Sequence, residues 1–325
     1  MGPLRVSVLA YPGCFASEVY GVLDLLTMAG HVAAAQGATE PSYAASVVSP
    51  RRRVVASGGS PLHCSALRPA DVLIVPGFET PPGGDLDATL ARLAPETAAI
   101  REQAGAGTAV VSICVGAFLV ADAGLLQGRR ATTSWLYADG FARRYPDVCL
   151  RPEQLVVTDR GVTTTAAFSA MYDFALRFVR EHDGPRVARG TARIALLDET
   201  RSTQAPYVDT DLLPTVGHGF SLDVMRRLDQ DLAAHYDLPA LSREFGVSSR
   251  TMLRRFKGET GRTPLSYLHT ARVRRARHLL ETTDRTVAAV AADVGYRDPG
   301  TFTRIFVRHT GRRPSAYRSS FRRRD

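Results

Sequence analysis

Cys114 lies where a run typical of a buried strand passes directly into a helical pattern, in VVSICVGAFLVADAGLL at residues 110–126. A thiol at such a junction can act as a nucleophile. The dipole and free amides of a helix N-terminus lower the thiol pKa, and the same amides can hold a developing oxyanion. The position of Cys114 therefore suits covalent thiol chemistry.

A thiol nucleophile also needs a carboxylate or base within reach and a second donor for developing charge. Glu18 falls at the start of the first helix expected after the first strand. The motif VPGF offers the backbone amides of Gly77 and Phe78 at the end of another strand. These residues are the first candidates to share a site with Cys114.

The elements that must position these residues form an α/β pattern up to about residue 183. Short β-rich runs alternate with amphipathic segments, which is typical of a mostly parallel sheet covered by helices. The runs are RVSVLAY, YAASVVS, DVLIVPG, TAVVSIC and GVTTTAA. We therefore expect a first domain over residues 1–183 and a linker rich in Pro, Gly, Thr and Asp over residues 184–220.

Length and composition limit the class of protein. A chain of 325 residues is long enough for two domains with cores of their own. It has no run of 18 apolar residues, and its N-terminus lacks the basic start and cleavage site of a signal peptide, so we expect a cytoplasmic protein with no membrane contact. Its cysteines occur singly, with no CxxC pair, which predicts neither a disulfide framework nor a metal or cofactor site; they are Cys14, Cys64, Cys114 and Cys149.

The last third of the chain is basic. Residues 221–325 hold 22 Lys and Arg against 11 Asp and Glu, whereas the preceding residues hold 19 against 21. Such a concentration of positive charge favours a polyanionic partner, usually nucleic acid. The alternative from charge alone is a solvated, arginine-rich surface.

This basic third contains one helical unit twice. In the first copy Asp237 can cap a short helix, Gly246 can end it in a left-handed turn, and Ser248 can cap a second helix. Met252 and Phe256 lie one turn apart and should be buried. A helix, a glycine turn and a basic second helix are the parts of a helix-turn-helix.

The second copy repeats these signals with Gly295, Asp298, Phe302 and Phe306. Between the copies, TPLSYLHTARVRRARHLLETT reads as one long helix that buries Leu265 among other residues and fixes the separation of the two units. Two recognition helices held in this way can enter successive major grooves, about 34–36 Å apart. An ordinary helical hairpin could bury one such pair, but the repeat with matching arginines favours DNA recognition.

Residues 220–320 resemble the DNA-binding domain of the AraC/XylS family of bacterial transcription regulators. The resemblance rests on SRTMLRRFKGETGRTPLSYL and VGYRDPGTFTRIFVRHTGRRPSAYR. It implies base contacts from Ser249, Arg250, Leu253, Arg254, Gly300, Thr303 and Arg304. Arginine can bind guanine through two hydrogen bonds, and Leu253 suits a thymine methyl. We expect phosphate contacts from Arg255, Lys257 and Arg308.

Residues 4–183 resemble the ThiJ/PfpI superfamily. The resemblance rests on VLAYPGCFASEVYGVLDLL, DVLIVPGF and SICVGAFLVADAGLLQGRRATTSW. It implies a flavodoxin-like, class I glutamine-amidotransferase-like three-layer sandwich. The following all-α domain with two helix-turn-helix motifs, over residues 221–325, completes the domain order of GlxA-type regulators.

The catalytic relatives pair the elbow cysteine with a glutamate and with a histidine about twenty residues later. Glu18 and Cys114 match, but ATTSW places Ser134 where the histidine would be. Serine cannot act as a base near neutral pH, so we expect no enzyme activity. A site that keeps its elbow and carboxylate but lacks the base suits effector binding. The expected pocket comprises Glu18, Gly77, Phe78, Cys114, Val115, Ser134 and Trp135.

Two other interpretations of Cys114 stay open, a residue that merely packs at the elbow and a thiol with residual chemistry or oxidation sensing. For the whole chain we expect a transcription regulator that binds double-stranded promoter DNA. Its first domain would sense a small metabolite or a partner and form a homodimer, and an activator would also contact RNA polymerase. The alternatives are a thiol-dependent hydrolase, hydratase or glyoxalase-like enzyme tethered to DNA, and an architectural protein with a scaffolding first domain.

Overall fold

The computed structural model describes residues 2–80, 85–198, 201–208 and 219–322. The chain folds into two compact units, residues 1–204 and 205–325. None of the helices within the described ranges is both long enough and apolar enough to cross a membrane.

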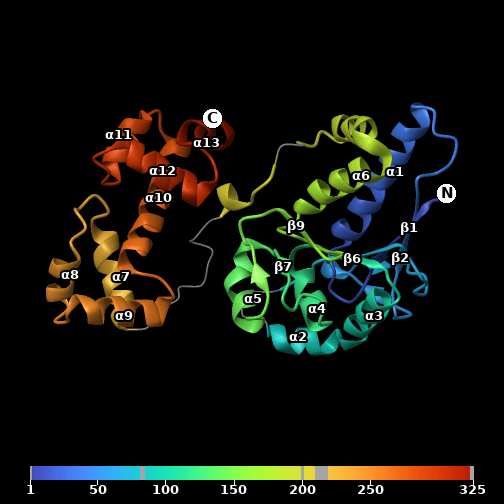
Figure 1. Ribbon diagram of the computed structural model, residues 1–325, viewed down its shortest axis with the longest axis horizontal. Coiled ribbons are helices and arrows are strands. Elements are labelled where there is room, and N and C mark those ends of the chain that lie inside the picture. The colour runs from blue at the N-terminus through green and yellow to red at the C-terminus, as the bar shows by residue number, and fades with distance from the viewer. Residues whose placement is uncertain (1, 81–84, 199–200, 209–218, 323–325) are drawn as a thin grey trace. The chain divides into compact units, whose positions relative to one another are not determined.

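A six-stranded sheet forms the middle layer of the first unit (Figure 1). Its strands, in spatial order, are β2 (Tyr43–Val48), β1 (Leu4–Leu9), β5 (Val72–Val75), β6 (Ala109–Ser112), β10 (Val162–Thr165) and β9 (Val156–Asp159). Neighbouring strands are parallel except for β9, which pairs antiparallel with β10 at the edge. All five expected strands form, and β9 is an additional one. Two shorter pairs of strands lie outside this sheet: β3 (Val54–Val55) with β4 (Pro61–Leu62), and β7 (Arg130–Ala131) with β8 (Cys149–Leu150).

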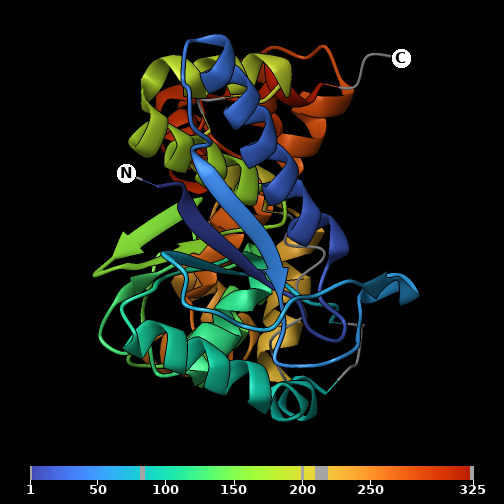
Figure 2. The same ribbon diagram turned by 90° about the vertical axis from the view of Figure 1, so that its right-hand side faces the viewer.

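Helices cover both faces of this sheet. Figures 1 and 2 show α1 (Ala16–Ala35) and α6 (Ala170–Ile194) side by side on one face. The opposite face is covered by α2 (Leu86–Arg92), α3 (Ala94–Gly105) and α4 (Ala117–Asp122), followed by α5 (Ala138–Arg144). The three layers enclose one apolar core. The first unit is therefore the expected flavodoxin-like sandwich.

The first unit continues beyond residue 183, where we expected the linker to begin. Gly184 interrupts α6 with a φ of 87°, but the helix resumes at Pro185 and buries Val187 and Ala188. Gly190 allows this second part to approach α1 closely, since a Cβ there would lie 2.7 Å from Val32 Cγ1. Apolar packing thus keeps this part of the expected linker in the first unit. Another part, residues 209–218, lies outside the described residues.

The second unit is helical over its described residues. Its helices are α7 (Phe220–Gln230), α8 (Leu238–Glu244), α9 (Ser249–Thr260), α10 (Pro264–Thr282), α11 (Val287–Asp293), α12 (Pro299–Thr310) and α13 (Pro314–Phe321). The short turn η4 (Ala205–Tyr207) precedes them. Together they form the expected all-α domain.

The capping and turn signals are confirmed. Asp237 accepts a hydrogen bond from the Ala240 amide, and Ser248 accepts one from the Thr251 amide. Asp298 accepts from the amides of Gly300 and Thr301 at the start of α12.

Both turn glycines and both buried i, i+4 pairs also behave as expected. Gly246 and Gly295 have positive φ angles. The paired residues Met252, Phe256, Phe302 and Phe306 are fully buried. Leu265 was wrongly expected to be buried: it is 38% exposed, because it lies in the first turn of α10, before the part of that helix packed between the two cores.

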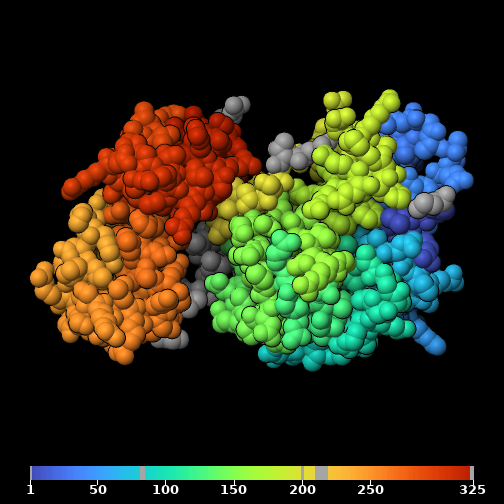
Figure 3. Space-filling view, viewed as in Figure 1, coloured from blue at the N-terminus to red at the C-terminus, as the bar shows by residue number. Residues whose placement is uncertain are grey.

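The second unit has two cores, one in each helix-turn-helix half. Figure 3 shows the two lobes, orange for α7 to α9 and red for α11 to α13. Arg272 of α10 joins them. Its buried guanidinium donates to the carbonyls of Leu232 and Ala234, each at 2.7 Å, and lies 5.2 Å from the centre of the Tyr296 ring.

The glycine turn at Gly295, in the second half, lies against the same guanidinium of Arg272. A Cβ at Gly295 would lie 2.8 Å from Arg272 Nη2 and 2.8 Å from the Leu232 carbonyl oxygen. Arg272 therefore holds the end of the first half against the turn of the second.

We expect Arg272→Met to lower the free energy of unfolding of the second unit by about 2–4 kcal/mol, because it leaves two carbonyls without their charged donor. Hydrogen exchange of the most protected amides in α10 to α12 measures this. Arg275→Met, an exposed position on the same helix, is the matched control and should change it by less than about 0.5 kcal/mol. Equal effects of the two substitutions would contradict this role of Arg272.

Candidate functional sites

Cys114 lies on a strained elbow between β6 and α4. Its φ of 53° is in the left-handed region that residues other than glycine rarely adopt. A 3-10 turn, η2 (Cys114–Gly116), leads into the helix. Gly116 lets the elbow pack on the end of β5, because a Cβ there would lie 2.6 Å from the Val75 carbonyl oxygen and closer still to that of Pro76. The expected strand-to-helix junction is therefore present.

Glu18 of α1 lies next to this elbow, on the far side of Gly77. Its fully buried carboxylate accepts a hydrogen bond from the Gly77 amide at 2.5 Å, while its Oε1 has no partner among the described residues. A Cβ on Gly77 would lie 3.3 Å from Cys114 Cβ and 3.4 Å from Val115 Cγ2. Four predicted pocket residues therefore meet here. The Gly77 amide, which we expected to be available to an oxyanion, is used by Glu18.

Burial controls the protonation of this site. It raises the pKa of Glu18 to about 7, against the opposing hydrogen bond from Gly77. Burial, with the charge of Glu18 as the second cause, raises the pKa of Cys114 to about 12. Hydrogen bonds from the Val115 amide and the Ser134 hydroxyl oppose this rise without reversing it. Despite its place before a helix, Cys114 is therefore a neutral thiol near pH 7.

The loop of residues 132–135 forms another wall of the site. Thr133 Oγ1 donates to the Cys114 carbonyl at 2.9 Å, and Ser134 is buried beside the thiol. Trp135 is half-buried. Phe78, by contrast, packs its ring edge-to-face on Tyr11 in the core, with centroids 6.4 Å apart.

Gln204 is a residue of this region that the sequence did not indicate. It is 1% exposed and holds the loop from both sides of Ser134. Its Nε2 donates to the Thr133 carbonyl at 2.9 Å, and its Oε1 accepts from the Trp135 amide at 3.2 Å. Gln204 follows Arg201, Ser202 and Thr203 in a segment whose Pro-rich and Thr-rich composition predicted only a linker.

The predicted base-contacting residues occupy α9 and α12. Four of them are exposed: Arg250, Arg254, Gly300 and Arg304. The other three are half-buried: Ser249, Leu253 and Thr303. No carboxylate of the described chain forms an ion pair with Arg250 or Arg254. Thr303 Oγ1 donates to the Pro299 carbonyl at 2.9 Å, and Arg304 donates to Thr301 Oγ1 at 3.0 Å.

The three predicted phosphate contacts differ in their surroundings. Lys257 and Arg308 are exposed in the last turns of α9 and α12. Arg255 is also exposed, but it donates to Glu259 at 3.0 Å and lies 4.2 Å from the centre of the Phe220 ring. Arg255 therefore has internal partners on α7 and α9.

We expect Glu18→Gln to change how stability depends on pH. The folded-state pKa of Glu18, about 7, lies above its ordinary value of 4.5, so the folded state keeps a proton that the unfolded state has lost. Wild-type stability should therefore fall relative to the variant as pH rises from 4.5 to 7, with the difference levelling off above pH 7 at roughly 3 kcal/mol. Urea unfolding at pH 5 and pH 8, followed by fluorescence of the sole tryptophan, Trp135, measures this. A difference in unfolding free energy that does not depend on pH would contradict the raised pKa of the buried Glu18 carboxyl.

Two family models match this chain. The helix-turn-helix domain matches residues 241–320, and the DJ-1/PfpI family matches residues 65–181. Solved structures match the first unit in the same way. A protein from Vibrio parahaemolyticus described as a transcriptional regulator is 27% identical, with a TM-score of 0.50, and the match covers 59% of this chain and 98% of that one. A ThiJ/PfpI family protein from Pseudomonas syringae is 23% identical, with a TM-score of 0.50, over 66% of this chain and 82% of that one, and shows the fold.

Curated relatives extend the match across both units. The HTH-type transcriptional regulator CdhR of Pseudomonas aeruginosa is 28% identical over 66% of this chain, a match that spans 63% of CdhR. GlxA of Rhizobium meliloti is 27% identical over 67% of this chain and 68% of its own length. Rv1931c of Mycobacterium tuberculosis is 28% identical over 78% of this chain and 96% of its own length. The chain thus combines a DJ-1/PfpI domain with an AraC-type helix-turn-helix domain, and it is similar over both to proteins named as HTH-type transcriptional regulators.

Proposed function

We propose that this chain regulates transcription by binding promoter DNA through α9 and α12 while its first unit senses a small molecule or partner. The observation that carries the proposal is the pair of capped recognition helices, held in one helical unit by α10 and Arg272. Such a pair can enter successive major grooves from one side of a duplex.

The exposed arginines give the proposed DNA interface its chemistry. Arg250, Arg254 and Arg304 present guanidinium groups that can bind guanine edges through two hydrogen bonds. Leu253 offers an apolar contact to a thymine methyl. The exposed Lys257 and Arg308 would contact phosphates, which set the register of a protein on DNA.

The first unit supports ligand binding better than catalysis. The neutral Cys114 thiol lacks a histidine base at position 134, and the Gly77 amide is already engaged by Glu18. We therefore propose that the pocket residues around Cys114 respond to an effector without turnover. A thiol-dependent enzyme remains the alternative, and it requires a turnover that Cys114→Ala abolishes.

The proposed regulator works as a homodimer in the cytoplasm, where promoter DNA is found. Two chains with two recognition helices each would bind repeated half-sites. If the chain is an activator, it also contacts RNA polymerase. Sedimentation of the full chain with and without DNA tests the dimer, and a monomer in both cases contradicts it.

We expect Arg254→Ala and Arg304→Ala each to relax specificity at one base pair by about 1–3 kcal/mol. Competition binding on singly substituted operators measures this. Arg226→Ala, which removes an exposed arginine of α7, is the matched control and should leave base preference unchanged. Equal losses on every sequence would assign Arg254 and Arg304 to phosphate contacts and contradict their role in base recognition.

The route from the first unit to the second is the segment 201–208, here called the strap. Its first half belongs to the first unit, where Thr203 pairs with Gln154 and Gln204 holds the loop beside Ser134. Arg201 adds an ion pair with Asp173 of α6. The strap therefore begins as a fixed part of the candidate ligand site.

Its second half belongs to the second unit. The carbonyls of Pro206 and Val208 accept hydrogen bonds from Arg277 of α10. The Tyr207 ring packs edge-to-face on Phe321 of α13, with centroids 5.3 Å apart. One peptide bond, between Gln204 and Ala205, thus joins the two anchored halves. We propose that a change in the Ser134 loop reaches α10 through the strap.

We expect Gln204→Ala to speed hydrogen exchange at the Trp135 amide and, in the other unit, at Val208 and along α10 near Arg277, by about tenfold. Arg277→Gln should in turn speed exchange at Trp135, since coupling is reciprocal. Gln103→Ala is the matched control, because Gln103 is also buried in the first unit and binds Thr108. Gln103→Ala should speed hydrogen exchange in the first unit only. If Gln204→Ala also speeds exchange only in the first unit, that result contradicts the proposed coupling.

A further inference from the structure

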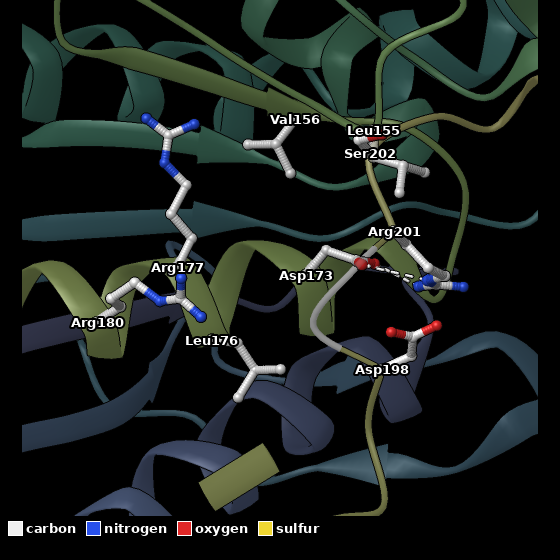
Figure 4. A pocket seen from close by; sticks show the side chains of 9 residues that line it. All are labelled: Leu155, Val156, Asp173, Leu176, Arg177, Arg180, Asp198, Arg201 and Ser202. Carbon is white, nitrogen blue, oxygen red and sulfur yellow. Dashed lines mark hydrogen bonds and ion pairs between the residues drawn. The ribbon is translucent and has the colours of Figure 1, made fainter. Parts of the chain in front are cut away.

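A cavity of about 310 Å³ opens in the first unit beside the strap (Figure 4). Its walls come from α6, from the start of β9 and from the first residues of the strap. None of its lining residues belongs to the site around Cys114, where the thiol residue itself is only 8% exposed. A volume near 300 Å³ is at the lower end of the range for small-molecule sites.

The cavity has two polar ends and an apolar middle. Figure 4 shows Arg177 and Arg180 at one end and the ion pair of Asp173 with Arg201 at the other. Val156 and Leu176 lie between them. Arg177 and Arg180 are three residues apart on α6, so both side chains project from the same face of the helix.

The two ion pairs at the cavity, Arg201 with Asp173 and Arg177 with Glu181, differ in how deeply they are buried. Asp173 is almost buried and is paired with Arg201, which also donates to the Ser169 side chain and carbonyl at 3.2 Å each. Within the described residues Arg177 pairs with Glu181, at 2.8 Å, and both side chains are more than half exposed. An exposed pair of this kind contributes little and can exchange for a ligand anion.

Asp198 also lines the cavity, on the side of the Asp173 and Arg201 pair and away from the two arginines of α6. A negative ligand group is therefore favoured only at the Arg177 end. The planar guanidinium of arginine matches the two oxygens of a carboxylate. The apolar middle favours a hydrocarbon body over a bare inorganic ion.

We propose that this cavity binds a small organic carboxylate, with the carboxylate at Arg177 and Arg180 and the apolar body against Val156 and Leu176. The inference rests on the proposed function and deepens it by naming a class of effector and a place for it. The opposite wall contains Arg201 and Ser202 of the strap, and the Ser202 carbonyl accepts from the Leu155 amide at 3.3 Å. An occupant would therefore contact the segment that holds the Ser134 loop.

Isothermal titration of the full chain with hexanoate, phenylacetate and benzoate tests the proposal, with the primary amide of each acid and inorganic phosphate as comparison probes. We expect at least one carboxylate to bind at concentrations below about 10 mM and its amide to bind at least about tenfold more weakly. Phosphate should bind more weakly than that carboxylate, because it lacks an apolar body.

The double variant Arg177→Gln/Arg180→Gln should weaken carboxylate binding by about tenfold or more. Arg186→Gln/Arg189→Gln is the matched control, because it removes two exposed arginines at the same spacing on the same helix but outside the cavity. It should bind the carboxylate as the wild type does.

Three results would overturn the proposal: no carboxylate binding to the wild type, equal binding to the Arg177→Gln/Arg180→Gln variant, or phosphate binding as tightly as every carboxylate. DNA binding, measured with no carboxylate, amide or phosphate probe present, tests the proposed function separately from the proposed carboxylate site. The Arg177→Gln/Arg180→Gln chain should retain wild-type affinity for DNA, because both substitutions lie in the first unit.

Discussion

Recognition of DNA by two helices of one chain depends on a fixed distance between these helices, and in this protein Arg272 joins the two halves that contain α9 and α12. Its buried guanidinium binds two carbonyls at the end of the first half and faces the Tyr296 ring of the second. A buried cation is tolerated only when its donors are satisfied, so the groups around Arg272 are held in place as well. The glycine at position 295 is part of this arrangement, since any side chain there would meet the guanidinium.

The first unit keeps the geometry of a nucleophile elbow while its electrostatics favour a neutral thiol. The same packing that brings Glu18 against Gly77 removes both Glu18 and Cys114 from water, and burial raises both pKa values. Gln204 and the strap then attach the adjoining loop to the segment that anchors on α10. We therefore propose that the elbow, the loop and the strap belong to one connected effector site.

Local signals in the sequence predicted much of this structure. The caps at Asp237, Ser248 and Asp298 are short-range hydrogen bonds, and the buried pairs follow from helical spacing, so both can be recognised from a few residues. The resumption of α6 after Gly184 could not be recognised in this way. It depends on apolar contact with α1, whereas the local Gly-Pro pair signals an end to the helix.

The site around Cys114 was predicted only where its residues carry local sequence signals. Glu18, Gly77 and Cys114 lie next to recognisable strand ends, but Gln204 acts through partners about seventy residues away, and no local pattern marks it. Protonation also depends on long-range burial, so the sequence pointed to a low thiol pKa where the structure holds a high one. The antiparallel edge strand β9 was missed although it is as long as β5, β6 and β10, and its place in the sheet depends on pairing with β10.

We propose that two helices of one chain, α9 and α12, contact DNA in successive major grooves. A hydroxyl-radical footprint of the full chain tests it most directly, on DNA flanking its own gene, with excess competitor and across a salt series. We expect a discrete site that survives competition, with protected segments about 34–36 Å apart on one side of the duplex. Weak protection that is indifferent to sequence, or a single protected segment per chain, would contradict it.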